Sequence, residues 1–139
     1  MRIALTVLVG LVALLMLPLG VQWMFSPGET AEGFGITLIG QDALSTARGD
    51  LGGMFLAGAA MAVIGLVTGN ATWLRALALL LGMIALGRVI GFAQEGMGPE
   101  GTRAFVAEIL MCAVLLARVW HQSRAAGRAG DDAAAAGNS

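Results

Sequence analysis

The sequence lacks lysine entirely and contains one cysteine, one histidine and few charged residues of either sign. Its eight basic residues are all arginine and stand against nine acidic residues, so the net charge is −1. This balance supplies no basic field for nucleic acid, and no nucleic-acid-binding motif is present, so we expect no nucleic-acid partner. Cys112 has no second cysteine with which to form a disulfide, and it lies in an apolar run typical of a small buried residue.

Catalytic and metal-binding groups are equally scarce. His121 is the single histidine and stands beside Trp120 near the C-terminus. One histidine and one cysteine do not make a metal site, and the sequence offers no nucleophile–base pair. We therefore expect no catalytic residues, no metal ligands and no cofactor, and we do not expect an enzyme.

Apolar residues, in contrast, are abundant. The chain has 139 residues, enough for one domain, and 58% of them are hydrophobic against 12% charged. A helix needs roughly 20 predominantly apolar residues to cross a membrane. Runs at residues 3–25, 47–68, 73–94 and 103–121 approach this length. They predict an all-α fold, an integral membrane four-helix bundle over residues 1–121. Residues 122–139 have little apolar surface to bury, so we expect a disordered tail there.

The first apolar run also has the appearance of a secretory signal peptide, because Arg2 precedes it. The run exceeds a signal-peptide core of about 7–15 residues and lacks a clear small-x-small cleavage site. We therefore expect it to be retained as the first membrane-spanning helix.

The arginines are distributed unevenly between the two sides of the predicted bundle. The side with both termini and the loop at residues 69–73 carries Arg2, Arg75, Arg118, Arg124 and Arg128. The other side carries Glu29, Glu32, Asp42, Asp50, Glu95 and Glu100, offset by Arg48 and Arg103. The positive-inside rule therefore predicts that both termini, and the tail, are cytoplasmic (N-in/C-in). Trp23, Trp73 and Trp120 fall at span ends, where aromatic residues anchor helices in the membrane interface.

The first outer loop is predicted to hold a short interfacial helix. Ser26 is placed to cap this helix, Pro27 takes its first position, and Glu29 completes a capping box. We expect the helix to end near Gly33 or Gly35.

Small residues recur at four-residue spacing on two of the predicted spans. The second span has Gly49, Gly53 and Ala57, and the third has Gly87 and Gly91. Helices in lipid associate through close backbone approach. These two stripes therefore predict the contact surface between the second and third spans.

Charged residues from three spans are predicted to reach one layer of the outer leaflet. They are Arg48 and Asp50 in the second span, Arg88 in the third and Glu108 in the fourth, with Glu95 at the rim. A charge deep in a span costs about 2.5–3.5 kcal/mol on insertion scales, and pairing would offset that cost. Three interpretations stay open. The cluster is a lock that fixes helix rotation, or it is a polar pocket that binds an anionic headgroup or relays protons, or its side chains extend toward the interface without pairing.

Three segments together resemble a known family. They are ARGDLGGMFLAGA at residues 47–59, ALGRVIGFAQEG at residues 85–96 and AEILMCAVLLA at residues 107–117. They resemble the domain-of-unknown-function 4345 family of small bacterial four-helix membrane proteins. The family pattern maps onto Arg48, Gly52, Gly53, Gly87, Arg88, Glu95, Gly96 and Glu108. The resemblance implies a four-helix membrane fold and carries no known activity with it.

We therefore expect a small multi-pass protein of the bacterial inner (plasma) membrane. The favoured function is that of a non-catalytic scaffold or accessory subunit of a larger complex. The alternative is binding or transport of a small lipid-like or anionic ligand through the polar cluster. The expected partners are membrane lipids, and a membrane-protein partner or further copies of this chain.

Overall fold

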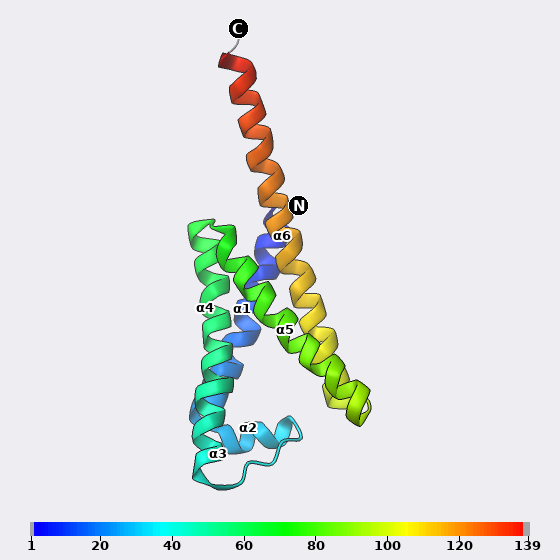
Figure 1. Cartoon of the computed structure of the whole chain (residues 1–139). Coiled ribbons are helices and arrows are strands. Elements are labelled where there is room, and N and C mark those ends of the chain that lie inside the picture. Colours follow the sequence, from blue (N-terminus) through cyan, green and yellow to red (C-terminus); the bar gives the residue numbers. More distant parts are fainter. Residues whose placement is uncertain (1, 138–139) are drawn as a thin grey trace.

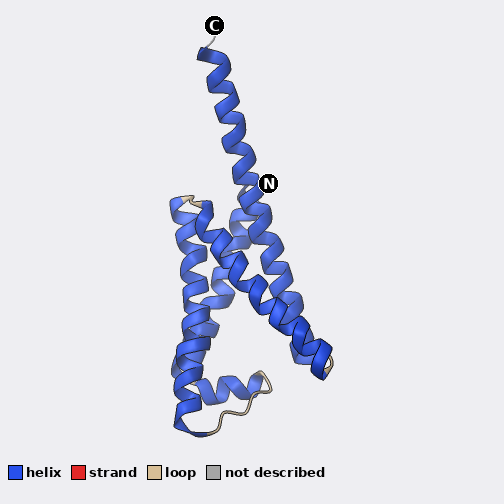
Figure 2. Cartoon of the chain, in the orientation of Figure 1, coloured by secondary structure: helices blue, strands red, loops and turns tan. Residues whose placement is uncertain are grey.

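The computed structural model describes the backbone of residues 2–137 and the side chains of residues 2–125, 127 and 128. The described part is helical, with short turns and no strand (Figure 2), and this confirms the predicted all-α class. The elements are α1 (Arg2–Phe25), α2 (Pro27–Gly33), α3 (Gly40–Ala47), the π-helical turn η1 (Arg48–Gly52), α4 (Gly53–Thr68), α5 (Ala71–Glu95) and α6 (Pro99–Gly137).

Four helical segments are long and apolar enough to cross a membrane, the number that the sequence predicts. They are Arg2–Phe25, Gly40–Thr68, Ala71–Glu95 and Pro99–Ala125. The second begins at Gly40 rather than at residue 47, because α3, η1 and α4 follow one another without a break. Polar residues within α3, such as Asp42 and Ser45, hide this extension from a reading based on apolar runs.

The four long segments are arranged as two pairs. Helix α1 lies beside α4, and α5 lies beside α6 (Figure 1). The pairs meet near the N-terminus and the α4–α5 turn, and they diverge toward the end that holds α2 and α3 (Figure 1). The main core lies where the pairs meet, and includes Val9, Val12, Met16, Ala59, Ala62, Leu74, Leu77, Leu81, Leu115 and Val119. The divergence decides which charged side chains can meet.

The connection between α1 and α3 builds a second, smaller core. Trp23 is only 1% exposed and is packed with Ala31 of α2 and Ala47 of α3. Its ring centroid lies 5.7 Å from that of Phe34. Trp23 lies near the end of α1, as predicted, and its side chain is covered by the chain itself because the short helix folds back over it. Trp73 and Trp120 are 38% and 54% exposed.

Helix α2 starts at Pro27, as predicted, but without the predicted capping box. Ser26 makes no side-chain capping hydrogen bond. Its carbonyl oxygen instead accepts hydrogen bonds from the backbone N–H of Thr30 at 3.0 Å and from Thr30 Oγ1 at 2.7 Å. The start of α2 is thus fixed by proline and by its first backbone turn rather than by a side chain.

The C-terminal end of α6 runs through residues 122–137, where the sequence predicts the start of a disordered tail, and the disorder stays a prediction. The helix continues without a break to Gly137, and in Figure 1 it extends well beyond the other helices. Two physical reasons favour this continuation. The segment is rich in alanine, the best helix former, and a helix that is already packed extends without a new nucleation step. Residues 138 and 139 lie outside the described chain.

Candidate functional site

The structure joins Arg88 of α5 to Glu108 of α6. Arg88 Nε donates hydrogen bonds to both carboxylate oxygens of Glu108, at 2.9 Å to Oε1 and 3.0 Å to Oε2. The Glu108 side chain is only 9% exposed, and that of Arg88 is 31% exposed. The acid is thus buried against its partner helix while the guanidinium keeps one open side. This is the part of the predicted cluster that the structure brings together.

Apolar and sulfur contacts flank this ion pair along the α5–α6 interface. On one side, the rings of Phe92 and Phe105 stack edge to face, with their centroids 5.7 Å apart. On the other side, Cys112 Sγ donates a weak hydrogen bond to the Ala78 carbonyl oxygen at 3.5 Å. Since Phe92 and Cys112 each follow a member of the pair by one helical turn, the three contacts form one ladder between the helices.

Arg48 and Asp50 do not join this pair. Among the described residues, the other ion pair joins Arg103 and Glu100, both exposed, at 2.8 Å. Arg48 Nε instead donates to the Met24 carbonyl oxygen at 3.1 Å, in the last turn of α1. A cation there also complements the negative end of the helix dipole. The prediction of a single four-residue cluster is therefore wrong.

The reason is the divergence of the two helix pairs. Arg48 and Asp50 belong to the α1–α4 pair, whereas the bonded charges belong to α5 and α6, which turn away at that end (Figure 1). Glu95, predicted at the rim, is exposed and forms no ion pair within the described chain. Arg88 and Glu108 pair as predicted, but a similar position along a span does not by itself place two residues on facing helices.

The predicted packing stripes are also wrong. A Cβ atom added to Gly49, Gly53 or Gly87 would have no neighbour within 4 Å, and one added to Gly91 would contact only Glu95 of its own helix, at 3.6 Å. Ala57, the remaining member, is exposed.

Close backbone approach occurs at other glycines. Those at which an added Cβ atom would crowd a neighbouring element are Gly20, Gly52, Gly58, Gly65 and Gly101. A Cβ on Gly20 would lie 2.8 Å from the backbone nitrogen of Leu56, and one on Gly58 would overlap the Met16 side chain. The closest helix contact is therefore α1 against α4, rather than the second predicted span against the third.

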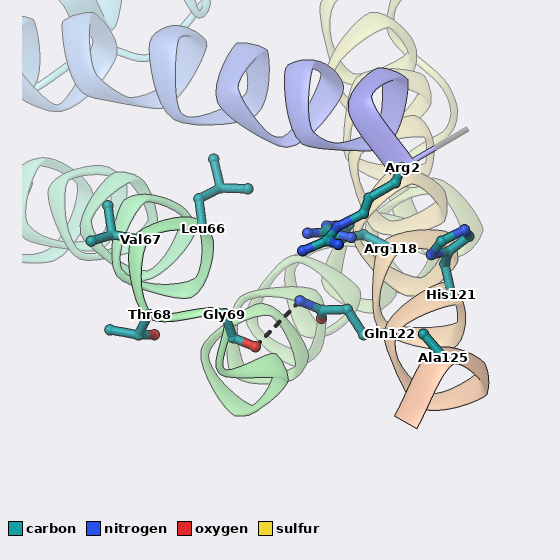
Figure 3. A pocket seen from close by; sticks show the side chains of 9 residues that line it. All are labelled: Arg2, Leu66, Val67, Thr68, Gly69, Arg118, His121, Gln122 and Ala125. Carbon is teal, nitrogen blue, oxygen red and sulfur yellow. Dashed lines mark hydrogen bonds between the residues drawn. The ribbon is translucent and has the colours of Figure 1, made fainter. Parts of the chain in front are cut away.

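A basic pocket lies at the opposite end of the molecule, and the sequence analysis did not predict it. Its volume is about 470 Å³, and its polar lining comes chiefly from Arg2, Thr68, Gly69, Arg118, His121 and Gln122 (Figure 3). Arg118 is only 6% exposed. The spacing of residues 118, 121, 122 and 125 on one face of a helix was available as an indication. The sequence argument used Arg118 only as one positive charge on the cytoplasmic side.

The described residues contain no group of three or more histidine, cysteine, aspartate or glutamate side chains that could hold a metal ion. The geometry therefore offers an internal ion pair, a helix-capping arginine and a basic pocket.

These features define an all-α protein with four helices long and apolar enough to cross a membrane. The chain belongs to the family described as Domain of unknown function (DUF4345), whose model matches residues 4–119. The match spans all four segments, and so extends the resemblance beyond residues 47–117. No curated protein and no solved structure gives a significant match to the chain.

Proposed function

We propose that this protein is a four-span protein of the bacterial inner membrane that acts as a non-catalytic scaffold or accessory subunit. The observation that carries the proposal is the bonding of Arg88 to Glu108. Both oxygens of the carboxylate accept hydrogen bonds from the arginine, so the acid is engaged by the neighbouring helix. A pair satisfied in this way fixes the rotation of α5 against α6.

Membrane insertion is supported by the outer surface of the four segments. Large apolar side chains are exposed on each of them, for example Leu14 at 63%, Val67 at 81%, Leu79 at 68% and Leu110 at 62%. Water would not favour so much exposed apolar surface on a small monomer, whereas lipid tails would cover it.

The proposed orientation places both termini in the cytoplasm. Arg2, Arg118 and the α4–α5 turn lie together at one end of the molecule (Figure 3). The connection that holds α2 and α3 lies at the other end (Figure 1), and it carries Glu29, Glu32 and Asp42. The positive-inside rule assigns the first end to the cytoplasm and α2 to the outer interface.

A ligand-binding function at the ion pair is the alternative, and one observation favours it. The Arg88 side chain is 31% exposed, and only its Nε is bonded to Glu108. Its terminal nitrogens would be free to bind a lipid-like or anionic ligand from the open side.

Purification of the tagged full chain in mild detergent, followed by mass spectrometry, tests the two functions. The wild type is compared with an Arg88→Met/Glu108→Leu double variant, which removes both charges together. A stoichiometric membrane protein that co-purifies with both forms supports the scaffold. A lipid or quinone that co-purifies with the wild type and is lost from the double variant supports the alternative. Absence of any stoichiometric partner protein, whether or not such a ligand is found, contradicts the scaffold.

A further inference from the structure

We infer that the pocket around Arg118 binds a phosphate-bearing anion at the end of the molecule where α1 begins and α4 ends. This pocket is separate from the Arg88–Glu108 pair, and the inference does not depend on the scaffold function. The pocket lies where the start of α1, the end of α4 and the last packed turns of α6 meet (Figure 3). Its volume of about 470 Å³ is within the usual range of roughly 300–1,000 Å³ for small-ligand sites.

The main argument is the charge of Arg118, which forms no ion pair among the described residues. The residue is 6% exposed, and its Nε is buried with no hydrogen-bond partner among the described residues. The described residues that line the pocket include no carboxylate. An arginine remains charged at any physiological pH, and burying its charge without a counter-ion is unfavourable. An anion from outside the chain would satisfy it.

A second arginine points to the same place. Arg2 of α1 and Arg118 of α6 both line the pocket, and Figure 3 shows both side chains reaching into the space between α1, α4 and α6. Two like charges that line one pocket repel each other, and an anion bound between them would offset that repulsion. Guanidinium groups donate paired hydrogen bonds in a planar fork that matches phosphate oxygens. The position of Arg2 therefore points to phosphate as the ligand group.

Gln122 lines the same pocket and is held in place by a hydrogen bond. Its Nε2 donates to the Gly69 carbonyl oxygen at 3.3 Å, which ties α6 to the α4–α5 turn. Its Oε1 is buried and has no partner among the described residues. The unsatisfied groups are thus a donor on Arg118 and an acceptor on Gln122. A hydrogen phosphate, or a phosphate ester that carries a hydroxyl group, supplies both complementary groups.

The surroundings suit a phospholipid headgroup as well as free phosphate. The Arg124 guanidinium lies 3.6 Å from the centre of the Trp120 ring, next to the pocket along α6. Tryptophan and arginine at the end of a membrane span mark the headgroup region. The headgroup source rests on the proposed membrane insertion, whereas the free-phosphate source does not.

The test uses the purified full chain in a non-ionic detergent and measures binding by native mass spectrometry and by the shift in Tm. The probes are inorganic phosphate, dioleoylphosphatidylglycerol and, as a lipid without net charge, dioleoylphosphatidylcholine. The variants are Arg118→Gln and Arg2→Gln. Arg75→Gln is the matched control, because Arg75 is an exposed arginine near the same end that does not line the pocket.

Loss of one charge-assisted hydrogen-bonding group predicts that the two pocket variants bind about tenfold to a hundredfold more weakly than wild type, while the control is unchanged. This pattern with phosphatidylglycerol alone assigns the site to a headgroup, and with inorganic phosphate alone to a soluble anion. Either pattern, or both together, supports the site. If Arg118→Gln does not fold, Arg2→Gln at the exposed start of α1 decides the outcome. Equal weakening by the control, equal binding of phosphatidylcholine, or no binding of either anion by the wild type would overturn the inference.

Discussion

Arg88 Nε lies almost equally far from the two carboxylate oxygens of Glu108, at 2.9 Å and 3.0 Å, across the α5–α6 interface. The single Nε–H group is therefore shared between the two oxygens, and each residue supplies the counter-charge of the other. Glu108 is the more dependent of the two, because its side chain is only 9% exposed.

The first prediction concerns the coupling between these two residues. Arg88→Met and Glu108→Leu should each lower the free energy of unfolding in detergent. The loss should be about 3 kcal/mol for Arg88→Met, because this change leaves the buried Glu108 carboxylate without its partner. The double variant should recover part of the loss, because neither charge then remains without its partner. Thermal or denaturant unfolding of the four proteins measures this coupling.

Matched controls separate the pair from a general effect of charge. Arg75→Met and Glu95→Leu remove the same charges from exposed positions on α5, and neither residue forms an ion pair within the described chain. Both should change stability by less than about 0.5 kcal/mol. Strictly additive losses in the Arg88/Glu108 cycle would show that the two residues are not coupled.

The second prediction concerns Arg48 as a cap on α1. Its Nε donates to the Met24 carbonyl oxygen at 3.1 Å from an exposed position. Arg48→Met should therefore lower the free energy of unfolding by about 1 kcal/mol, the usual contribution of one hydrogen bond. Asp50→Asn, two residues away and without an ion pair within the described chain, should have little effect. If Asp50→Asn destabilises the protein more than Arg48→Met does, Asp50 makes an interaction that is absent from the described contacts, and the capping role of Arg48 is not the main one.

The third prediction concerns topology, and it starts from a Cys112→Ala background. Gly98→Cys, in the α5–α6 turn, should react with a membrane-impermeant thiol reagent added to intact spheroplasts. Thr72→Cys and Ser123→Cys, at the other end, should react only after lysis. Thr72 is preferred to Asn70 because the Asn70 side chain caps α5 by accepting from Thr72 N at 2.9 Å. Labelling of Ser123→Cys from outside would contradict the proposed cytoplasmic C-terminus.

The sequence was sufficient for features that depend on local composition. Apolar runs were enough to locate four long helices, and Pro27 was enough to start α2. The pairing of Arg88 with Glu108 also followed from their similar depth in neighbouring antiparallel helices. These features need only the length and the direction of each helix.

Features that depend on which helix faces which were not predictable in the same way. Several glycines of the second span have similar spacing, and only the rotation of α4 decides that Gly52, Gly58 and Gly65 face neighbours while Gly49 and Gly53 do not. The separation of Arg48 from Arg88 depends on the divergence of the helix pairs, which no local pattern encodes. Arg118 was missed for the same reason, since its burial depends on α1 and α4 as well as on α6.

The last prediction tests the observed contact between α1 and α4. A Cβ atom on Gly20 would lie 2.8 Å from the backbone nitrogen of Leu56, and a backbone atom cannot be moved aside by a change of rotamer. Gly20→Ala should therefore force the two helices apart and destabilise the protein by about 1–3 kcal/mol, as overpacking does in close-packed interiors.

Gly53→Ala is the matched control, because an added Cβ there meets nothing within 4 Å and the position is helical. It should be neutral, or more stable by up to about 1 kcal/mol, since alanine is the better helix former. Unfolding in detergent measures both variants. The opposite order, with Gly53→Ala the more damaging change, would favour the stripe of small residues at Gly49, Gly53 and Ala57. The contact between α1 and α4 through Gly20 would then not be the one that holds the helices together.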